Sequence, residues 1–337
     1  MTESITYGMT SLAELNEEAY FSLYRKVYKD LSSLTRRWQW EYRENPFADD
    51  IKFMVTRSGD RLVAATTRLP FDIAIDGRVH RAYFSVDSMV DPDFRRMGIM
   101  ERLYEDAAQT MPLLYSKGTM PGMYKLLMKI GYRPIVPNTF LVCYLRPFQL
   151  IMKRLGLCGN RNVKENAIHD GSTVKELIPI KRYGEQFDSF IDSISEGFYS
   201  RVVKDSKYMN WRYVGVPHKK YYSFYARNGQ GNISAVVVMS VKGNTGKIVD
   251  IHWDASNTHE PGRTISLSKT YLRRMGCAKV LCWCTYKSLR ASLKNKYFYD
   301  RGETPRFSVY STSMDLSRLS SGNRFHFMDG DGDHDIL

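Results

Sequence analysis

The residues with the clearest chemical signature lie in one basic, glycine-containing turn of this 337-residue chain. Residues 83–90 are rich in strand-forming types, and Pro92 stops the strand because proline cannot donate to a ladder. Residues 95–100 read Arg-Arg-Met-Gly-Ile-Met and open a helix. The free N–H groups of such a turn point at one spot, and the helix dipole adds to their field. The turn therefore predicts a binding site for a pyrophosphate.

The elements that position this turn can be predicted from their patterns. The helix after it has one buried face, because apolar residues recur at steps of three and four. These residues are Met100, Leu103, Tyr104, Ala107, Ala108 and Met111. Residues 52–57 and 61–68 are predicted strands joined by a hairpin turn. A capping box over residues 11–14 predicts a helix from there to about Leu31. A further helix ends before Gly131, and residues 140–145 form a last strand.

The turn resembles the acetyl-CoA motif of the GNAT acyltransferases, R-x-x-G-x-G/A after a strand that ends in Val-x-Pro. The matching residues are Val90, Pro92, Arg95, Gly98 and Met100, where Met100 replaces the usual small residue. The order of elements up to residue 147 is also that of a GNAT domain. The resemblance implies acetyl-CoA as acyl donor. It implies cofactor contacts from Met89, Val90, Arg95, Arg96, Met97, Gly98, Ile99 and Met100.

The resemblance also implies direct transfer of the acyl group to an amine, with a backbone N–H at Met89 or Val90 polarising the thioester carbonyl. Such a reaction needs a base for the ammonium and an acid for the leaving thiolate. We expect Asp87 to be the base, since strand alternation places it on the face of Met89. The alternative is that Asp87 holds a neighbouring loop. For the acid we expect Tyr124, one helical turn before the position at which the family carries its tyrosine.

The second half of the chain repeats the first. The pattern W-x-Y-x-x-x-P occurs at 40–46 and 211–217, and V-D-x-x-x-D occurs at 86–91 and 249–254. The second copy lacks the phosphate loop, because its Arg-Arg-Met-Gly string at 273–276 lies at a helix end. We therefore expect a GNAT acyl-CoA-binding domain at 1–147, a linker at 148–172 and a degenerate GNAT-like domain at 173–337. The predicted fold class is α/β (α+β), with a mixed, mostly antiparallel central sheet flanked by helices in each domain.

Composition limits the partners. The net charge of +13 comes from dispersed residues, and no nucleic-acid fold signature occurs, so we expect no nucleic-acid partner. No apolar run reaches the roughly 20 residues of a membrane helix. Five cysteines without C-x-x-C fit a reducing cytoplasm. We expect no metal site: Cys282 and Cys284 are predicted to be packing residues. The acidic run at 329–335 is predicted to be a solvated terminus rather than a calcium loop.

These observations predict a cytoplasmic acetyl-CoA-dependent N-acetyltransferase that acts on a small-molecule amine. Resemblance to two-domain relatives in polysaccharide gene clusters suggests an amino sugar, free or nucleotide-linked, as the acceptor. Two alternatives remain. One is an aminoacyl transferase of the FemABX kind, which also pairs two GNAT domains. The other is a module that binds CoA or a partner without catalysis.

Overall fold

The computed structural model describes residues 4–148, 176–194, 198–302, 305–320 and 325–331, with the single residues 152, 155 and 174. Contacts divide the chain into two units, each with its own sheet. The first unit comprises residues 1–136, 216–218 and 305–321, and the second comprises 137–215, 219–304 and 322–337. The predicted linker at 148–172 lies outside the described residues except for three positions.

The sheet of the first unit is mixed. Its strands follow the order β1 (Ile5–Ser11), β2 (Lys52–Ser58), β3 (Arg61–Ile75), β4 (Arg78–Val90), β5 (Leu113–Lys117), β15 (Phe307–Ser311) and β6 (Arg133–Pro134). Along this path only β4 and β5 are parallel. The helices of this unit are α1 (Glu17–Tyr28), α2 (Ser32–Trp38), α3 (Ile99–Thr110), α4 (Pro121–Ile130) and α10 (Leu316–Ser320). A core beneath α3 and α4 buries Leu103, Ala107, Leu114 and Leu127.

The sheet of the second unit repeats this arrangement. Its order is β8 (Ile178–Pro179), β10 (Tyr221–Arg227), β11 (Ile233–Lys242), β12 (Thr245–Trp253), β13 (Lys279–Trp283), β7 (Phe140–Tyr144) and β14 (Tyr299–Asp300). Again only the fourth and fifth strands of the path, β12 and β13, are parallel. Its helices are α6 (Glu185–Ser193), α7 (Ser206–Met209), α8 (Glu260–Arg274) and α9 (Lys287–Asn295), and a short strand pair joins β9 (Ser200–Val202) to β16 (Phe325–His326).

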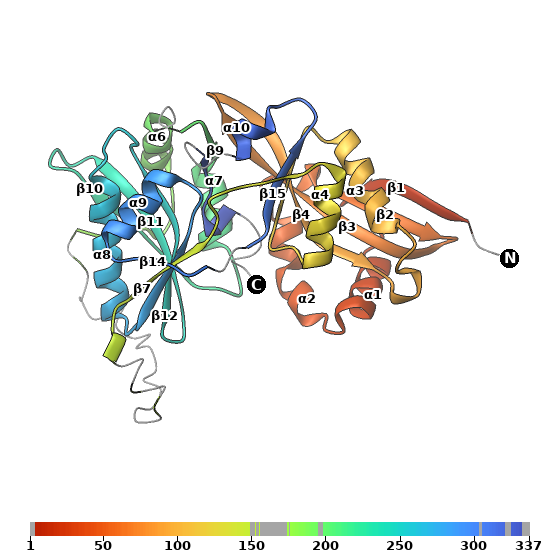
Figure 1. The fold of residues 1–337 in the computed structure, drawn as a ribbon, viewed down its shortest axis with the longest axis horizontal. Coiled ribbons are helices and arrows are strands. Elements are labelled where there is room, and N and C mark those ends of the chain that lie inside the picture. The colour runs from red at the N-terminus through yellow and green to blue at the C-terminus, as the bar shows by residue number, and fades with distance from the viewer. Residues whose placement is uncertain are drawn as a thin grey trace. The chain divides into compact units, whose positions relative to one another are not determined.

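The sixth strand of each sheet comes from the other half of the chain. β7 follows α4 and β6 of the first unit in sequence but pairs with β13, and β15 follows β14 of the second unit but pairs with β5. In Figure 1, β15 is drawn in blue beside the orange strands of the first unit, and β7 is yellow-green among later strands. The predicted division at residue 147 therefore assigns residues 140–145 to the wrong unit. Local pattern identifies a strand but does not identify the sheet it joins.

The N-terminal helix begins later than predicted. Residues 5–11 form strand β1, paired with β2 along its whole length. Ser11 does bond to Glu14, with Oγ donating to Oε2 at 3.0 Å, but this contact closes a turn rather than a helix. Helix α1 starts at Glu17, where the side chain of Asn16 accepts a hydrogen bond from the Ala19 N–H at 3.0 Å. Asparagine and serine are both good caps, so the sequence pattern could not distinguish these starts.

Candidate functional site

The predicted phosphate loop is an exposed turn at the N-terminus of α3. Helix α3 begins at Ile99 rather than at Arg95, so residues 95–97 belong to the turn. Gly98 caps the helix with φ of 73°, and Arg96 also has a positive φ of 68°. Nothing lies within 4 Å of the position that a Cβ of Gly98 would occupy. The left-handed backbone explains the glycine, and the open space beside it leaves the N–H groups of the helix N-terminus accessible to a phosphate.

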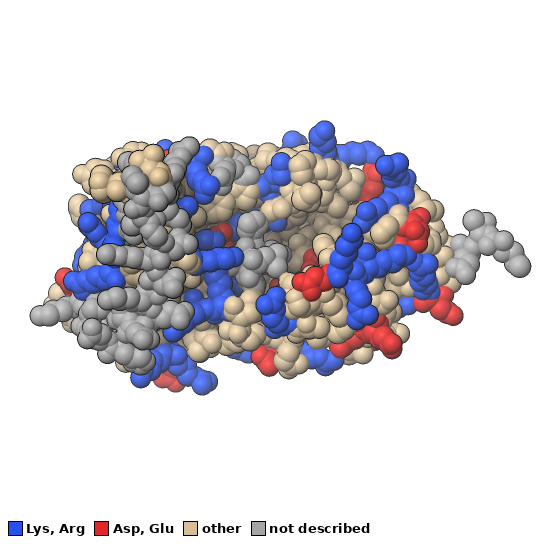
Figure 2. All heavy atoms as spheres, turned by 90° about the horizontal axis from the view of Figure 1, so that it is seen from below, with Lys and Arg blue, Asp and Glu red and all other residues tan. Residues whose placement is uncertain are grey.

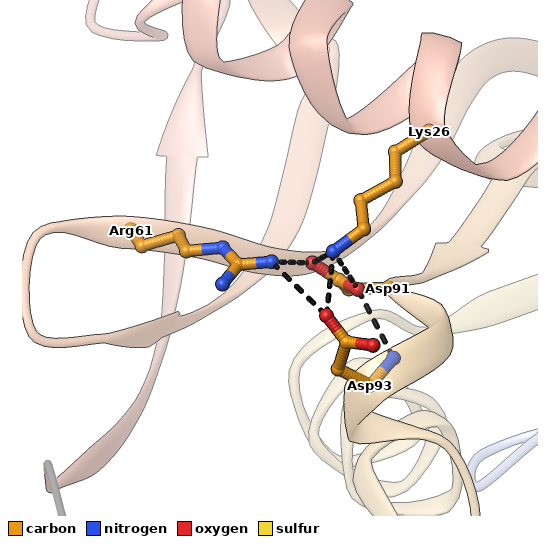
Figure 3. Close-up of polar contacts among 4 residues, drawn as sticks. All are labelled: Lys26, Arg61, Asp91 and Asp93. Carbon is orange, nitrogen blue, oxygen red and sulfur yellow. Dashed lines mark hydrogen bonds and ion pairs between the residues drawn. The ribbon is translucent and has the colours of Figure 1, made fainter.

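Ion pairs anchor the start of this turn. The Asp91 carboxylate is 1% exposed and contacts Lys26 on α1, with Nζ 2.7 Å from Oδ1, and Arg61 at the start of β3. Figure 3 shows both cations converging on Asp91 and Asp93. Burial opposes the charged form, but hydrogen bonds from Lys26, the Asp93 N–H and Arg61 hold the pKa of Asp91 below its usual value. The turn is thereby tied to α1 and β3.

Strand β4 is irregular where the motif places the thioester. Ala65 pairs with Met89, but Thr67 pairs with Val86, so β4 carries one extra residue there. Asp87 lies in this bulge with φ of 47°. β4 pairs with β5 only at Tyr83 and Phe84, so residues 85–90 have no register partner on β5 within the described chain. A strand edge left open in this way can form backbone hydrogen bonds with a ligand.

The carboxylate of Asp87 is held by the helical segment before β2. Arg37 Nη2 lies 2.5 Å from Asp87 Oδ1, and the Tyr42 hydroxyl donates to Oδ2. Arg37 also pairs with Glu41, and the Asp87 side chain is only 10% exposed. Because of the bulge, the next side chain, Ser88, bonds instead to Tyr104 of α3. These contacts support the alternative reading of Asp87 as an anchor.

The helix that carries Tyr124 is placed as predicted. α4 ends at Gly131, which has φ of 106°. Leu127 faces the core with no exposed surface, and Tyr124, one turn earlier, is half-buried. Met120, which directly precedes α4, is 76% exposed. No contact in the structure assigns Tyr124 a chemical role, so its role as acid stays a prediction.

A buried polar group beneath α3 was missed by sequence reasoning. Arg68 on β3 is fully buried, with Nη1 donating to Ser85 and its guanidinium 4.1 Å from the centre of the Tyr104 ring. Ser88 Oγ lies 3.0 Å from Tyr104 Oη and 2.8 Å from Thr66 Oγ1. The available signal was the spacing of Arg68 from Ala64. Period-two alternation places the arginine on the same strand face as this core residue.

The second unit has the same anchor with different neighbours. Tyr213 Oη donates to Asp250 Oδ2 at 2.8 Å, and Lys204 Nζ lies 2.5 Å from carboxylate oxygens of both Asp250 and Asp331. Although burial opposes ionisation, His252 and Lys204 hold the pKa of Asp250 well below its usual value. The pKa of Asp331 is raised, mainly by burial.

The acidic segment at 329–331 is therefore not a solvated terminus. Asp329 and Asp331 are buried, and Asp329 pairs with Lys247 at 2.6 Å. Gly330 lies against the ring of Tyr213, whose hydroxyl would be 2.0 Å from an added Cβ. The turn contributes to the core around Asp250. Residues 332–337, which complete the acidic run, lie outside the described chain.

The second unit also differs at the helix that corresponds to α3. The N-terminus of α8 carries its own buried carboxylate, Glu260, which accepts bonds from Arg263 and Thr264. The copied Arg-Arg-Met-Gly string ends α8, where Gly276 has φ of 91°. A helix start that already faces a carboxylate does not favour a phosphate. The start of α8 therefore differs from the open glycine turn at the start of α3.

His252 does not lie in an open cleft. It is buried, with Nε2 3.3 Å from Asp250, and lines a cavity of about 10 Å³ within the second unit. His326 lines the same cavity, and burial together with nearby Lys204 and His252 lowers its pKa to about 3. The cavity has room for about one water molecule.

Figure 2 shows lysine and arginine side chains at several places on one face, with acidic side chains among them. None of the described helices combines the length and the apolar character that a membrane span requires.

Residues 9–133 match the family model described as an acetyltransferase (GNAT) domain. A probable N-acyltransferase from Enterococcus faecalis V583 is similar in structure, with a TM-score of 0.62, 11% identity, and coverage of 94% of this chain and 75% of that chain. A GCN5-related N-acetyltransferase from Anabaena variabilis has a TM-score of 0.61 at 10% identity, over 94% and 75% of the two chains.

A more divergent neighbour is the Saccharomyces cerevisiae N-myristoyltransferase with bound myristoyl-CoA. Its TM-score is 0.54 at 10% identity, over 90% of this chain and 82% of that chain. At these identities the likeness establishes the fold alone. A search of curated proteins finds no significant match.

Proposed function

Because residues 9–133 carry a GNAT acetyltransferase domain, we propose that this protein is an acetyl-CoA-dependent N-acyltransferase that acts on a small-molecule amine. One observation carries the proposal. The exposed, left-handed Gly98 turn lies at the N-terminus of α3, directly after a bulged strand whose edge is open. We propose a cytoplasmic location, since the four cysteines within the described residues are free and buried.

The residues present fit a CoA derivative. The N–H groups of Gly98, Ile99 and Met100 would hold its pyrophosphate, with Arg95, Arg96 and Met97 around them. The backbone at Met89 and Val90 would lie beside the thioester. When bound, the group supplies an activated acyl carbon. The chain's part is to orient it, to polarise its carbonyl and to move protons.

We propose acetyl-CoA as the donor because the space behind β4 is filled. Arg68, Tyr104 and Tyr132 are almost completely buried between α3, α4 and the strands. A long acyl chain would have to displace these side chains, including a charged one, whereas an acetyl group would not. The proposed donor therefore differs from the myristoyl-CoA bound to the N-myristoyltransferase neighbour.

We assign proton donation to the leaving thiolate to Tyr124, which is half-buried on α4. The sequence predicts Asp87 as the base, but its contacts with Arg37 and Tyr42 support a positioning role more directly. For the acceptor we propose an amino sugar first. The family resemblance is the only support for that class.

Two measurements test the proposal. Acetyl-CoA should raise the melting temperature by mass action. Arg95→Ala and Gly98→Asp should abolish the shift, the second by placing a carboxylate at the phosphate site. Arg273→Ala, an exposed arginine in the copied string, and Gly77→Asp, a turn glycine with φ of 76°, should leave it unchanged. A Gly98→Asp variant with a full shift would refute the loop assignment.

The second measurement is release of CoA from acetyl-CoA in a panel of amines, with amino sugars first. Turnover with one amine class identifies the acceptor. Binding of acetyl-CoA without turnover on any amine would refute the enzyme proposal and favour a CoA-binding module.

A further inference from the structure

Arg68 is a buried cation that has no ion-pair partner among the described residues. It has no exposed surface, and its Nε and Nη2 atoms have no hydrogen-bond partner there. Its Nη1 donates to the hydroxyl of Ser85 and, at 3.5 Å, to that of Thr66. Burial of a charge is costly unless the charge is paired. A negative charge beside the guanidinium would therefore stabilise it.

Tyr104 is the group placed to supply it. Its ring lies 4.1 Å from the guanidinium carbon of Arg68, and its hydroxyl bonds to Ser88 at 3.0 Å. The other titratable groups near it are the phenols of Tyr132, after α4, and Tyr28 on α1. Burial opposes the phenolate, but Arg68, Ser88 and Ser85 outweigh it and lower the pKa of Tyr104. Loss of the Tyr104 proton would convert a lone cation into an ion pair.

Ser88 connects this pair to the reaction site. It belongs to the bulged part of β4 that has no partner on β5, and it is half-exposed while Tyr104 is 1% exposed. Its hydroxyl can accept a proton from one side and donate one to the other. Asp87, the base predicted from sequence, is instead held by Arg37 and Tyr42. The base position is therefore open.

We infer that Ser88 accepts the proton of the attacking ammonium and passes its own proton to Tyr104, whose deprotonated form Arg68 stabilises. This inference rests on the proposed N-acyltransferase function. The N–H bond of the ammonium breaks, and its electron pair stays on nitrogen and forms the bond to the acyl carbon. As the carbon–sulfur bond breaks, the CoA thiolate takes a proton from Tyr124. The nitrogen then loses its second proton to Tyr124 as the amide forms, which restores Tyr124. Tyr104 ends the step as a neutral phenol and returns its proton to solvent.

The first test needs no acceptor. Ultraviolet titration of the full-length protein, taken as a difference from Tyr104→Phe, should show one tyrosine that ionises below the pH of free tyrosine. Arg68→Lys keeps the cation and should keep this early ionisation. Arg68→Met should move it to higher pH. Ser88→Ala should move it less than Arg68→Met does, since Arg68 is the larger cause of the lowered pKa. A Tyr104 that titrates like free tyrosine overturns the inference, whatever the enzyme assay shows.

The second test uses CoA release from acetyl-CoA with an amine from the acceptor panel. Tyr104→Phe and Ser88→Ala should each lower turnover about 100-fold, the usual effect of removing a base. Arg68→Met should shift the acidic limb of the kcat/KM profile to higher pH, and Arg68→Lys should restore it. Tyr271→Phe, which removes another buried phenol in the second unit, should match wild type.

The outcomes separate the two proposals. Full turnover and an unchanged pH profile in Tyr104→Phe would reduce the cluster to a structural contact and overturn the inference, while leaving the N-acyltransferase proposal intact. A wild-type protein that binds acetyl-CoA but acetylates no amine would refute the enzyme proposal, and with it the inference that depends on it.

Discussion

Tyr213 donates a 2.8 Å hydrogen bond to Asp250, and Tyr42 donates the corresponding bond to Asp87 in the other unit. Each tyrosine lies in a π-helical turn, Gln39–Arg43 or Asn210–Val214. Asp250 follows a register shift in β12, and Asp87 lies within one in β4. The W-x-Y and V-D patterns are thus one contact repeated. π-Turns are rare and favour functional positions. The repeat keeps the strand bulge in both units, although only one unit has the phosphate loop.

Lys204 provides the first stability prediction. It is 1% exposed and lies between two buried carboxylates, so Lys204→Met would leave Asp250 and Asp331 without their cation. Breaking a buried pair in this way costs about 3–5 kcal/mol. Urea denaturation should show this loss. Lys26→Met is the control, because Lys26 is 39% exposed and Asp91 keeps Arg61, so the loss should be much smaller than for Lys204→Met. Equal losses would contradict the buried-pair account.

His326 predicts a pH dependence of stability. Its pKa falls from 6.5 in the unfolded chain to about 3 in the fold, mainly through burial. Between these values the unfolded chain binds a proton that the folded chain does not, so stability is complete above pH 6.5 and declines as the pH falls. The slope is about 1.4 kcal/mol per pH unit. Urea denaturation between about pH 4.5 and pH 7 should measure this slope. The window lies above the ordinary pKa values of carboxyl groups.

Variants distinguish the contribution of His326 to this pH dependence from that of other titratable groups. His326→Phe fits the surrounding rings of Phe198, Trp253 and Tyr286 and should flatten the slope. His259→Gln, at an exposed position, should not. An unchanged slope in His326→Phe would assign the pH dependence to other groups.

Sequence patterns predicted the local elements well where one feature dominated. The strands at 52–57 and 61–68, the buried face of α3, and the glycine that ends α4 are confirmed. So is the packing role of Cys282 and Cys284, which are fully buried. Each of these depends on periodicity or on a glycine backbone preference, which neighbouring residues determine.

The remaining features depend on contacts that are distant in sequence. No local pattern indicates that β15 pairs with β5, that β4 bulges at Asp87, or that Asp331 pairs with Lys204. The candidate site illustrates the difference. The phosphate turn was recognisable from its letters, whereas the Arg68–Tyr104–Ser88 cluster joins three elements and appears only when the sheet is assembled.

Tyr124 carries a kinetic prediction. Tyr124→Phe removes only a proton donor from a half-buried position, so acetyl-CoA should bind with nearly unchanged affinity. Turnover should fall on the order of 100-fold, as for loss of one general acid. Calorimetry with acetyl-CoA and initial rates with the identified amine would test both parts. A variant with the full rate would move the role to Tyr132 or to water.

The last prediction concerns β15, the strand that pairs with β5 in the sheet of the first unit. A chain that ends at Leu145 lacks β15, whose residues pair with β5 along its whole length and bury Phe307 and Val309 completely. Without it, β5 becomes an open hydrophobic edge, and we expect aggregation and no cooperative thermal transition. The Ile135 N–H donates to the Phe307 carbonyl at 2.9 Å, so a short glycine–serine linker from Val136 to Pro305 can restore the strand. A chain of residues 1–136 linked to 305–320 should therefore fold where the longer fragment fails. Cooperative melting of the fragment ending at Leu145, with normal acetyl-CoA binding, would contradict the role assigned to β15.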